Sequence, residues 1–164
     1  MSIIMDLFNL TQHIDPTLTD ESFWSIIDTI DSEYEGDSEA VVSSLVRHLS
    51  HCEDDYIFRF DDRLAELIDA IGGKEWSDDL FGNERVKKDL FLSARCRAVS
   101  MGKEHYTRIF SRKERLSDEG IYENNGVYCS TTDGLLTVAA AAWSRKNLKP
   151  IEDYPHKRNY GVSE

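Results

Sequence analysis

The chain has 164 residues, of which 40% are hydrophobic and 30% are charged, a composition that fits one globular domain and neither a disordered nor a membrane-embedded chain. Its net charge is −12, and residues 1–80 hold 20 Asp or Glu against 4 Lys or Arg, whereas residues 81–164 hold 11 against 15. The balance of −16 in the first half disfavours nucleic acids and anionic membranes as partners. It favours a basic protein partner or, alternatively, pairing of the acids with the more basic second half within the fold.

The chain opens with residues 1–18, which we expect to form an N-terminal arm. The first ten residues, MSIIMDLFNL, lack Lys and Arg and are interrupted by Asp6, unlike a secretory signal peptide. No stretch approaches the roughly 20 apolar residues of a membrane helix. The three cysteines, Cys52, Cys96 and Cys129, are widely spaced and form no Cys-x-x-Cys pair. They are typical of reduced thiols, so we expect a cytoplasmic protein.

The first predicted helix begins after Thr19, a suitable N-cap residue that is followed by two acids. Apolar residues then recur at helical spacing until Gly36: Phe23, Ile26, Ile27 and Ile30. Further helices are predicted after Asp37, over residues 54–71 before Gly72-Gly73, and over residues 83–101. After Gly102 a further helical turn, KEHYTRIF, follows.

The remainder of the chain contains one β signal and one strong helix. Asn125-Gly126 lies between β-forming residues, so we expect a short hairpin or an ordered loop over residues 121–129. The segment TTDGLLTVAAAAWSRKN, residues 131–147, predicts the last helix. Residues 150–164 are predicted to form a tail that is either extended over the surface or frayed. The pattern predicts a mostly α fold: a single-domain bundle of about five to six helices over residues 1–164, with one short β-hairpin.

Ten of the 27 residues from 53 to 79 are acidic. On a helical wheel at about 100° per residue, the apolar side chains of residues 54–71 gather on one side. Opposite them lie Asp55, Asp62, Glu66 and Asp69. Arg59 and Arg63 are placed to form weak surface pairs with Asp55 and Glu66. Because catalytic carboxylates usually occupy clefts, this stripe is interpreted as a surface that meets either a partner or only water.

Motifs that would define a reaction are missing from the sequence. There is no Gly-x-Ser-x-Gly, Gly-x-Gly-x-x-Gly or P-loop pattern. His48 and Cys52 are spaced to share a zinc ion, but no second His/Cys cluster supplies the remaining ligands. We therefore expect no metal, no cofactor and no enzymatic activity.

Four short motifs occur in an order that resembles a bacterial family of small proteins known only as a domain of unknown function. They are an FW..ID helix (Phe23, Trp24, Ile27, Asp28), an SDD turn (Ser77, Asp78, Asp79), an arginine-bearing helix (Phe91, Arg95, Gly102, Tyr106) and a closing LLxVA helix (Leu135, Leu136, Val138, Ala139, Ala142, Trp143). The resemblance covers roughly residues 19–150. By association, it implies a component of a bacterial toxin–immunity system.

The leading hypothesis is an immunity protein that neutralises a cognate, basic toxin and contacts neither nucleic acid nor membrane. Its predicted contact residues are Asp55, Asp62, Glu66, Asp69, Trp76, Asp78 and Asp79. The alternative is a small-ligand-binding or enzymatic domain with a polar pocket around the SDD turn and Arg95. A regulatory or scaffold protein with an unrelated partner is a third possibility that the sequence does not separate from the first.

Overall fold

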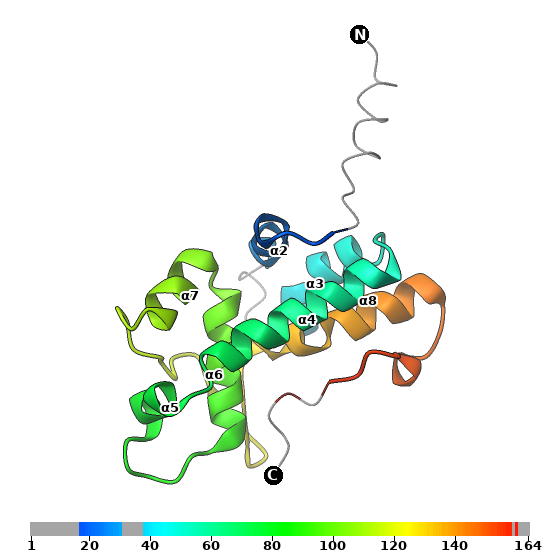
Figure 1. Ribbon diagram of the computed structural model, residues 1–164. Helices are drawn as coiled ribbons and strands as arrows, with labels where there is room; N and C mark the ends of the chain where they lie inside the picture. Colours follow the sequence, from blue (N-terminus) through cyan, green and yellow to red (C-terminus); the bar gives the residue numbers. More distant parts are fainter. Residues whose placement is uncertain (1–16, 31–37, 159, 161–164) are drawn as a thin grey trace.

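The computed structural model describes residues 17–30, 38–158 and 160, and within them the fold is mostly α-helical, as predicted (Figure 1). These residues form seven α-helices, one two-stranded antiparallel sheet and two 3₁₀ helices. Most of the predicted arm, residues 1–16, lies outside the described residues, as do Gly36 and Asp37.

The first three helices are α2 (Asp20–Ile27), α3 (Ser38–Leu49) and α4 (Asp54–Ala70). Thr19 is the N-cap of α2, since its hydroxyl oxygen accepts a hydrogen bond from the Ser22 N–H at 3.0 Å. The periodicity predicted a longer helix, but α2 ends at Ile27, and the Thr29 hydroxyl then donates to the Ile26 carbonyl at 2.7 Å. The hydroxyl gives the Ile26 carbonyl a hydrogen-bond donor in place of the backbone N–H that would reach it if the helix continued.

Three helices make up the middle of the chain: α5 (Lys74–Phe81), α6 (Lys88–Ser100) and α7 (Lys103–Phe110). Ser77, Asp78 and Asp79 lie inside α5, so the predicted SDD turn is wrong. Gly102 separates α6 from α7 with a φ of 102°, a conformation that L side chains rarely adopt. The helix is therefore interrupted at Gly102 and a further helix follows, as the sequence predicted.

The hydrophobic core lies where α4 packs against α6 and α8 and where α8 packs against α3 (Figure 1). The inner face of α4 is fully buried, with exposed fractions of 0–1% for Ile57, Phe60, Leu64 and Ile68. Burying each such side chain stabilises the fold by about 1.5–3 kcal/mol. The opposite side of α4 faces outward, as the helical wheel predicted.

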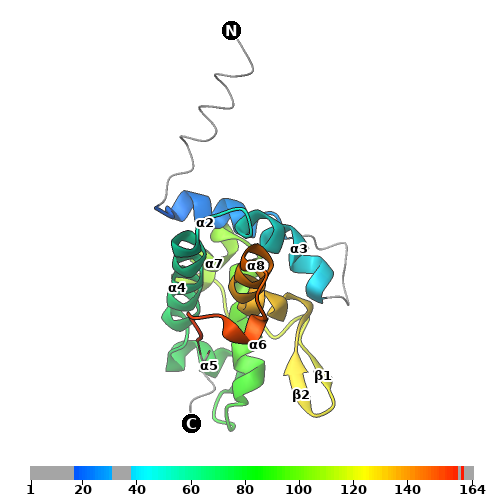
Figure 2. The same ribbon diagram turned by 90° about the vertical axis from the view of Figure 1, so that its right-hand side faces the viewer.

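The predicted hairpin is present as β1 (Tyr122–Asn124) and β2 (Val127–Cys129), and it projects from the helical body (Figure 2). Asn125 and Gly126 have φ angles of 54° and 82°, which is the type I′ turn that an Asn-Gly pair favours. The segment predicted as one last helix begins as a 3₁₀ helix, η2 (Thr131–Thr137), and continues as α8 (Val138–Asn147).

The predicted tail begins with a short 3₁₀ helix, η3 (Ile151–Asp153). Its next residue, Tyr154, is only 4% exposed and packs at a centroid distance of 5.9 Å against the ring of Trp143 in α8. The described part of the tail is thus attached to the helical body rather than frayed.

Candidate partner-binding surface

The outer side of α4 carries three of the predicted contact residues as exposed carboxylates: Asp55, Glu66 and Asp69. Asp55 is bonded to Arg59 at 2.9 Å and Glu66 to Arg63 at 3.0 Å, so both predicted surface pairs are confirmed. The side chains of Asp55 and Glu66 remain 71% and 65% exposed. Pairs this exposed are worth only a few tenths of a kcal/mol, because water competes for both charges.

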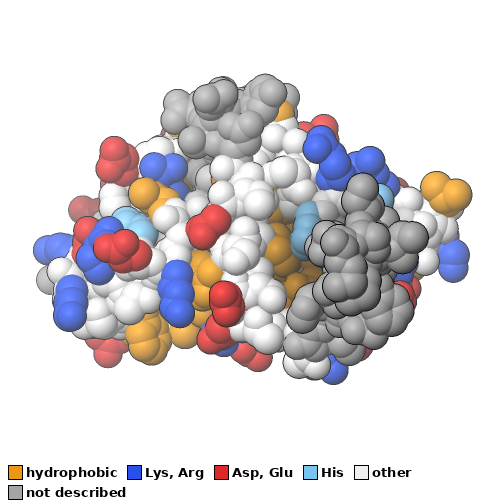
Figure 3. Space-filling model, turned by 90° about the horizontal axis from the view of Figure 1, so that it is seen from above, with side chains coloured by type: hydrophobic (Ala, Val, Ile, Leu, Met, Phe, Trp, Pro, Cys, Tyr) orange, Lys and Arg blue, Asp and Glu red, His pale blue; other side chains and the backbone are white. Residues whose placement is uncertain are grey.

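Arg63 links this face of α4 to the beginning of α2. Its guanidinium also contacts Asp20 at 2.9 Å. Asp20, Asp62 and Glu66, together with Arg59 and Arg63, line a shallow hollow of about 250 Å³. Acidic and basic side chains are also interspersed over the described part of the upper face (Figure 3). The surface is therefore acid-rich, but basic side chains are mixed among the acids to a greater extent than the helical wheel indicated.

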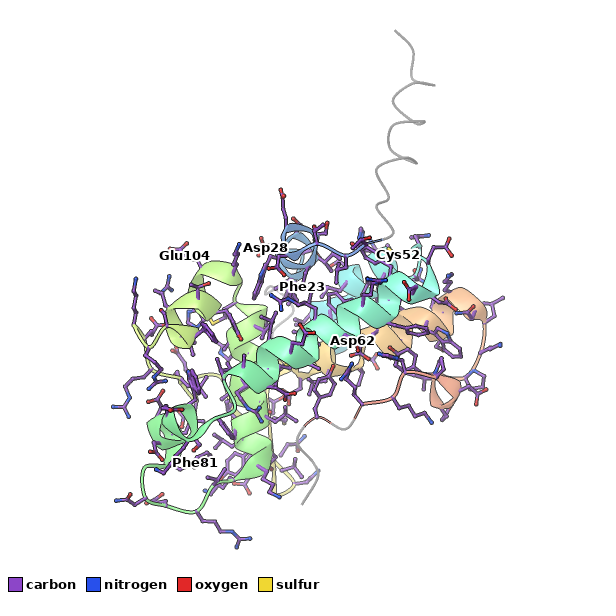
Figure 4. All side chains as sticks on the ribbon, viewed as in Figure 1. Phe23, Asp28, Cys52, Asp62, Phe81 and Glu104 are labelled. Atoms are coloured by element: carbon purple, nitrogen blue, oxygen red, sulfur yellow. The ribbon has the colours of Figure 1, made fainter. Side chains whose placement is uncertain are left out.

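Asp62, a fourth predicted contact residue, is bound by the tail. His156 Nε2 lies 2.7 Å from an Asp62 carboxylate oxygen, and Arg158 forms an ion pair with the same oxygen. Figure 4 labels Asp62 on α4, on the side where the tail lies. The tail supplies basic groups to α4 in the way that a basic partner would.

The neighbouring acid, Asp61, was not predicted to have a role and is almost fully buried. Its two oxygens accept hydrogen bonds from the hydroxyls of Tyr154, at 2.9 Å, and Tyr160, at 2.5 Å. Burial, reinforced by the charge of Asp61, raises the pKa of both tyrosines far above the ordinary value. Both therefore stay protonated and act as donors that fasten the tail to α4.

The last three predicted contact residues lie on α5. Asp78 is bonded to Lys74 at 2.7 Å, and its side chain is 44% exposed. Trp76 is half-buried, and its indole N–H donates to the Ile109 carbonyl of α7 at 3.0 Å. The guanidinium of Arg112 lies over the Trp76 ring, 5.3 Å from its centroid. Trp76 therefore joins α5 to α7, and Asp78 faces outward.

Asp79 is held inside the fold, with a side chain only 7% exposed. Both of its oxygens accept from Arg112, at 2.7 and 2.8 Å, and one also accepts from the Leu116 N–H at 2.8 Å. Burial is the largest influence and would raise the pKa of Asp79, but the hydrogen bonds from Arg112 and Leu116 together hold it below the ordinary value. Asp79 thus anchors the segment after α7 to α5.

Arg95, the other residue of the alternative hypothesis, is buried in α6 with 8% exposure. It donates to the carbonyl of Ile68 at 3.2 Å and of Phe91 at 3.3 Å, and it lies over the Phe91 ring. Burial lowers the pKa of Arg95, while the nearby charge of Asp69 acts in the opposite direction. Its cation sits near the C-terminal end of α4, where a positive charge is favoured.

Neither a metal centre nor a membrane span is found in residues 17–30, 38–158 and 160. No three His, Cys, Asp or Glu side chains of this part come together as metal ligands. The Cys52 thiol instead donates to the His48 carbonyl at 3.5 Å. None of the helices described is both long and apolar enough to cross a membrane.

A single domain of packed helices with an acid-rich outer face is the class of protein that the fold defines. The chain belongs to the DUF4240 family of proteins of unknown function, whose model matches residues 18–145. The match supports the resemblance to an uncharacterised domain family and ends before the tail. No curated protein and no solved structure gives a significant match to this chain.

Proposed function

We propose that this protein is a cytoplasmic immunity protein that binds and neutralises a cognate, basic bacterial toxin. It does so through an acidic surface made of four outward-facing carboxylates on α4 and α5: Asp55, Glu66, Asp69 and Asp78. The observation that carries the proposal is that these acids are turned away from the core, while the first half of the chain has a charge balance of −16.

The ion pairs of this surface are easily exchanged. Among the described residues, the cations that bond Asp55, Glu66 and Asp78 lie within one turn of the same helix. Such exposed pairs contribute about 0.2–0.5 kcal/mol each, so a partner's Lys or Arg side chains could replace them at little cost. A net charge of −12 would also steer a basic protein towards the molecule and raise its association rate by 10-fold or more.

The other three predicted contact residues have different roles in this proposal. Asp79 and Trp76 are engaged with residues of α7 and of the segment that follows it, and they fix the position of α5. Asp62 is covered by His156 and Arg158, so a partner reaches it only by displacing the tail. The four acids of the acidic surface are therefore expected to contribute more to binding than these three.

The test is co-expression with a candidate basic toxin encoded by a neighbouring gene. The native chain should rescue growth, and a variant with the acidic surface neutralised (Asp55→Asn, Glu66→Gln, Asp69→Asn, Asp78→Asn) should not. A matched control neutralises four exposed acids elsewhere: Glu119→Gln, Glu123→Gln, Glu152→Gln and Asp153→Asn. Failure of the native chain to rescue growth, or an equal loss of rescue in the control, would contradict the proposal.

A small-ligand or enzymatic site around Arg95 and the SDD segment is the second candidate. It requires Arg95 or Asp79 to contact a substrate, whereas both are bonded within the fold. We therefore rank it below the immunity proposal.

A further inference from the structure

A hollow of about 310 Å³ opens between the end of α2, the beginning of α3, the last turn of α6 and the beginning of η2. This volume is at the lower end of the range of small-molecule sites, roughly 300–1,000 Å³. One part of its wall is apolar, formed by Ile27, Ile30, Val41 and Met101. The other part is polar and is formed by Asp28, Arg97, Ser100, Thr131 and Thr132.

Arg97 is the cation of this hollow, and no anion of the described residues is bonded to it. Arg97 is half-buried, and its guanidinium lies against the backbone of Gly120: a Cβ added there would lie only 2.9 Å from the guanidinium carbon. By contrast, Arg95 donates to two carbonyls and Arg112 to the carboxylate of Asp79. Since no anion of the described residues pairs with this guanidinium, a bound carboxylate would gain charge-assisted hydrogen bonds to it.

Asp28 is the anion of the same hollow. It is the C-terminal cap residue of α2, and one of its oxygens lies 3.4 Å from the position that a Cβ on Gly102 would take. Figure 4 labels Asp28 beside α2, on the side towards α7. Within residues 17–30, 38–158 and 160, no cation pairs with Asp28, and Arg97 itself is not within ion-pair distance. As far as the described residues go, the hollow therefore presents two opposite charges that are not paired with one another.

We infer that this hollow binds a small zwitterion with an apolar side chain, namely a free α-amino acid. The carboxylate pairs with Arg97, the ammonium group with Asp28, and the side chain packs against the accessible part of the apolar wall, Ile30 and Met101. An inorganic anion would be repelled by Asp28 and by the net charge of −12, and a simple amine would leave Arg97 unpaired. This site uses none of the acids proposed to contact the toxin.

Titration of the isotope-labelled full chain with L-leucine and L-valine, followed by backbone amide NMR, tests the inference. The largest shifts should map to Ser100, Thr131 and Thr132. The same titration with 4-methylvalerate, which lacks the ammonium group, and with isoamylamine, which lacks the carboxylate, should give at least about 10-fold weaker binding, because each loses a charge-assisted contact. Inorganic phosphate should not bind.

Two variants test the assigned charges. Arg97→Met should weaken leucine binding about 10-fold or more, whereas Arg145→Met, at an exposed position on α8, should leave it unchanged. Asp28→Asn should weaken leucine but not 4-methylvalerate. The inference is wrong if neither amino acid shifts these amides at concentrations up to about 20 mM, or if the native chain binds 4-methylvalerate as tightly as leucine. The analogue comparison uses only the native chain, so it holds even if a variant fails to fold.

Discussion

Two neighbouring aspartates of α5 should respond very differently to replacement by alanine. Asp79 is 7% exposed and accepts three hydrogen bonds, two from the Arg112 guanidinium and one from the Leu116 N–H. Asp78 is 44% exposed and pairs only with Lys74, whose side chain is 81% exposed. The pair is a matched comparison, because both changes remove the same carboxylate from the same short helix.

The magnitudes follow from burial. Charge-assisted hydrogen bonds are worth about 1.5–3 kcal/mol each, but water can reach Arg112 and replace part of what is lost. We therefore expect Asp79→Ala to lower the free energy of unfolding by about 2–3 kcal/mol, which corresponds to a fall in Tm of about 5–10 °C for a chain of this size. Asp78→Ala should change the free energy of unfolding by less than about 0.5 kcal/mol.

Urea denaturation of the two variants and of the native chain measures both values. Arg112→Ala combined with Asp79→Ala completes a double-mutant cycle, and the coupling between the two residues should exceed about 1 kcal/mol. Equal effects of Asp78→Ala and Asp79→Ala, or a coupling near zero, would refute the assignment of Asp79 as an internal anchor.

The remaining predictions concern stability at low pH, the attachment of the tail and the turn of the hairpin. Because the pKa of Asp79 is lower in the folded chain than the ordinary value near 3.9, its stabilisation should be complete above about pH 4 and be lost as the pH falls through the lower folded value. An Asp79→Asn variant whose stability deficit persists undiminished at pH 2 would contradict this. Tyr154→Phe and Tyr160→Phe each remove one bond to Asp61 and should lower the free energy of unfolding by about 1 kcal/mol in urea denaturation, and no loss in either would show that the tail is not fastened by these hydroxyls. Gly126→Ala introduces a side chain at a φ of 82° and should cost about 1 kcal/mol by thermal unfolding, whereas a neutral effect would argue against the type I′ turn.

Local sequence signals predicted much of the fold. The apolar periodicity around Ile57 and Phe60 located α4 and its buried side, and the Asn125-Gly126 pair located the hairpin. Both signals depend on residues close together in the chain, where helix and turn geometry leave few alternatives. Gly72-Gly73 correctly predicted the end of α4. Because a double glycine also suggests a loop, the helix that begins directly after it, α5, was not predicted.

Long-range contacts were less accessible from the sequence. Asp79 pairs with a residue 33 positions away, and nothing in the spacing of the acids distinguishes it from Asp78. The buried position of Asp61 did have a signal: it lies four residues after Ile57 and three before Leu64, on the core side of the wheel. An acid at such a position needs buried donors, and Tyr160 supplies one from 99 residues away.

If the acidic surface meets a basic toxin, as proposed, charge governs how fast the two proteins associate, and the association rate of purified toxin with this protein is the sharpest test. Stopped-flow measurements at about 10 mM and about 150 mM salt should show that association with the native chain slows about 10-fold or more at the higher salt concentration. The variant with the four acids of α4 and α5 neutralised should associate slowly at both. If the native chain and the neutralised variant associate with the toxin at equal rates, and neither rate depends on salt, the proposal is contradicted.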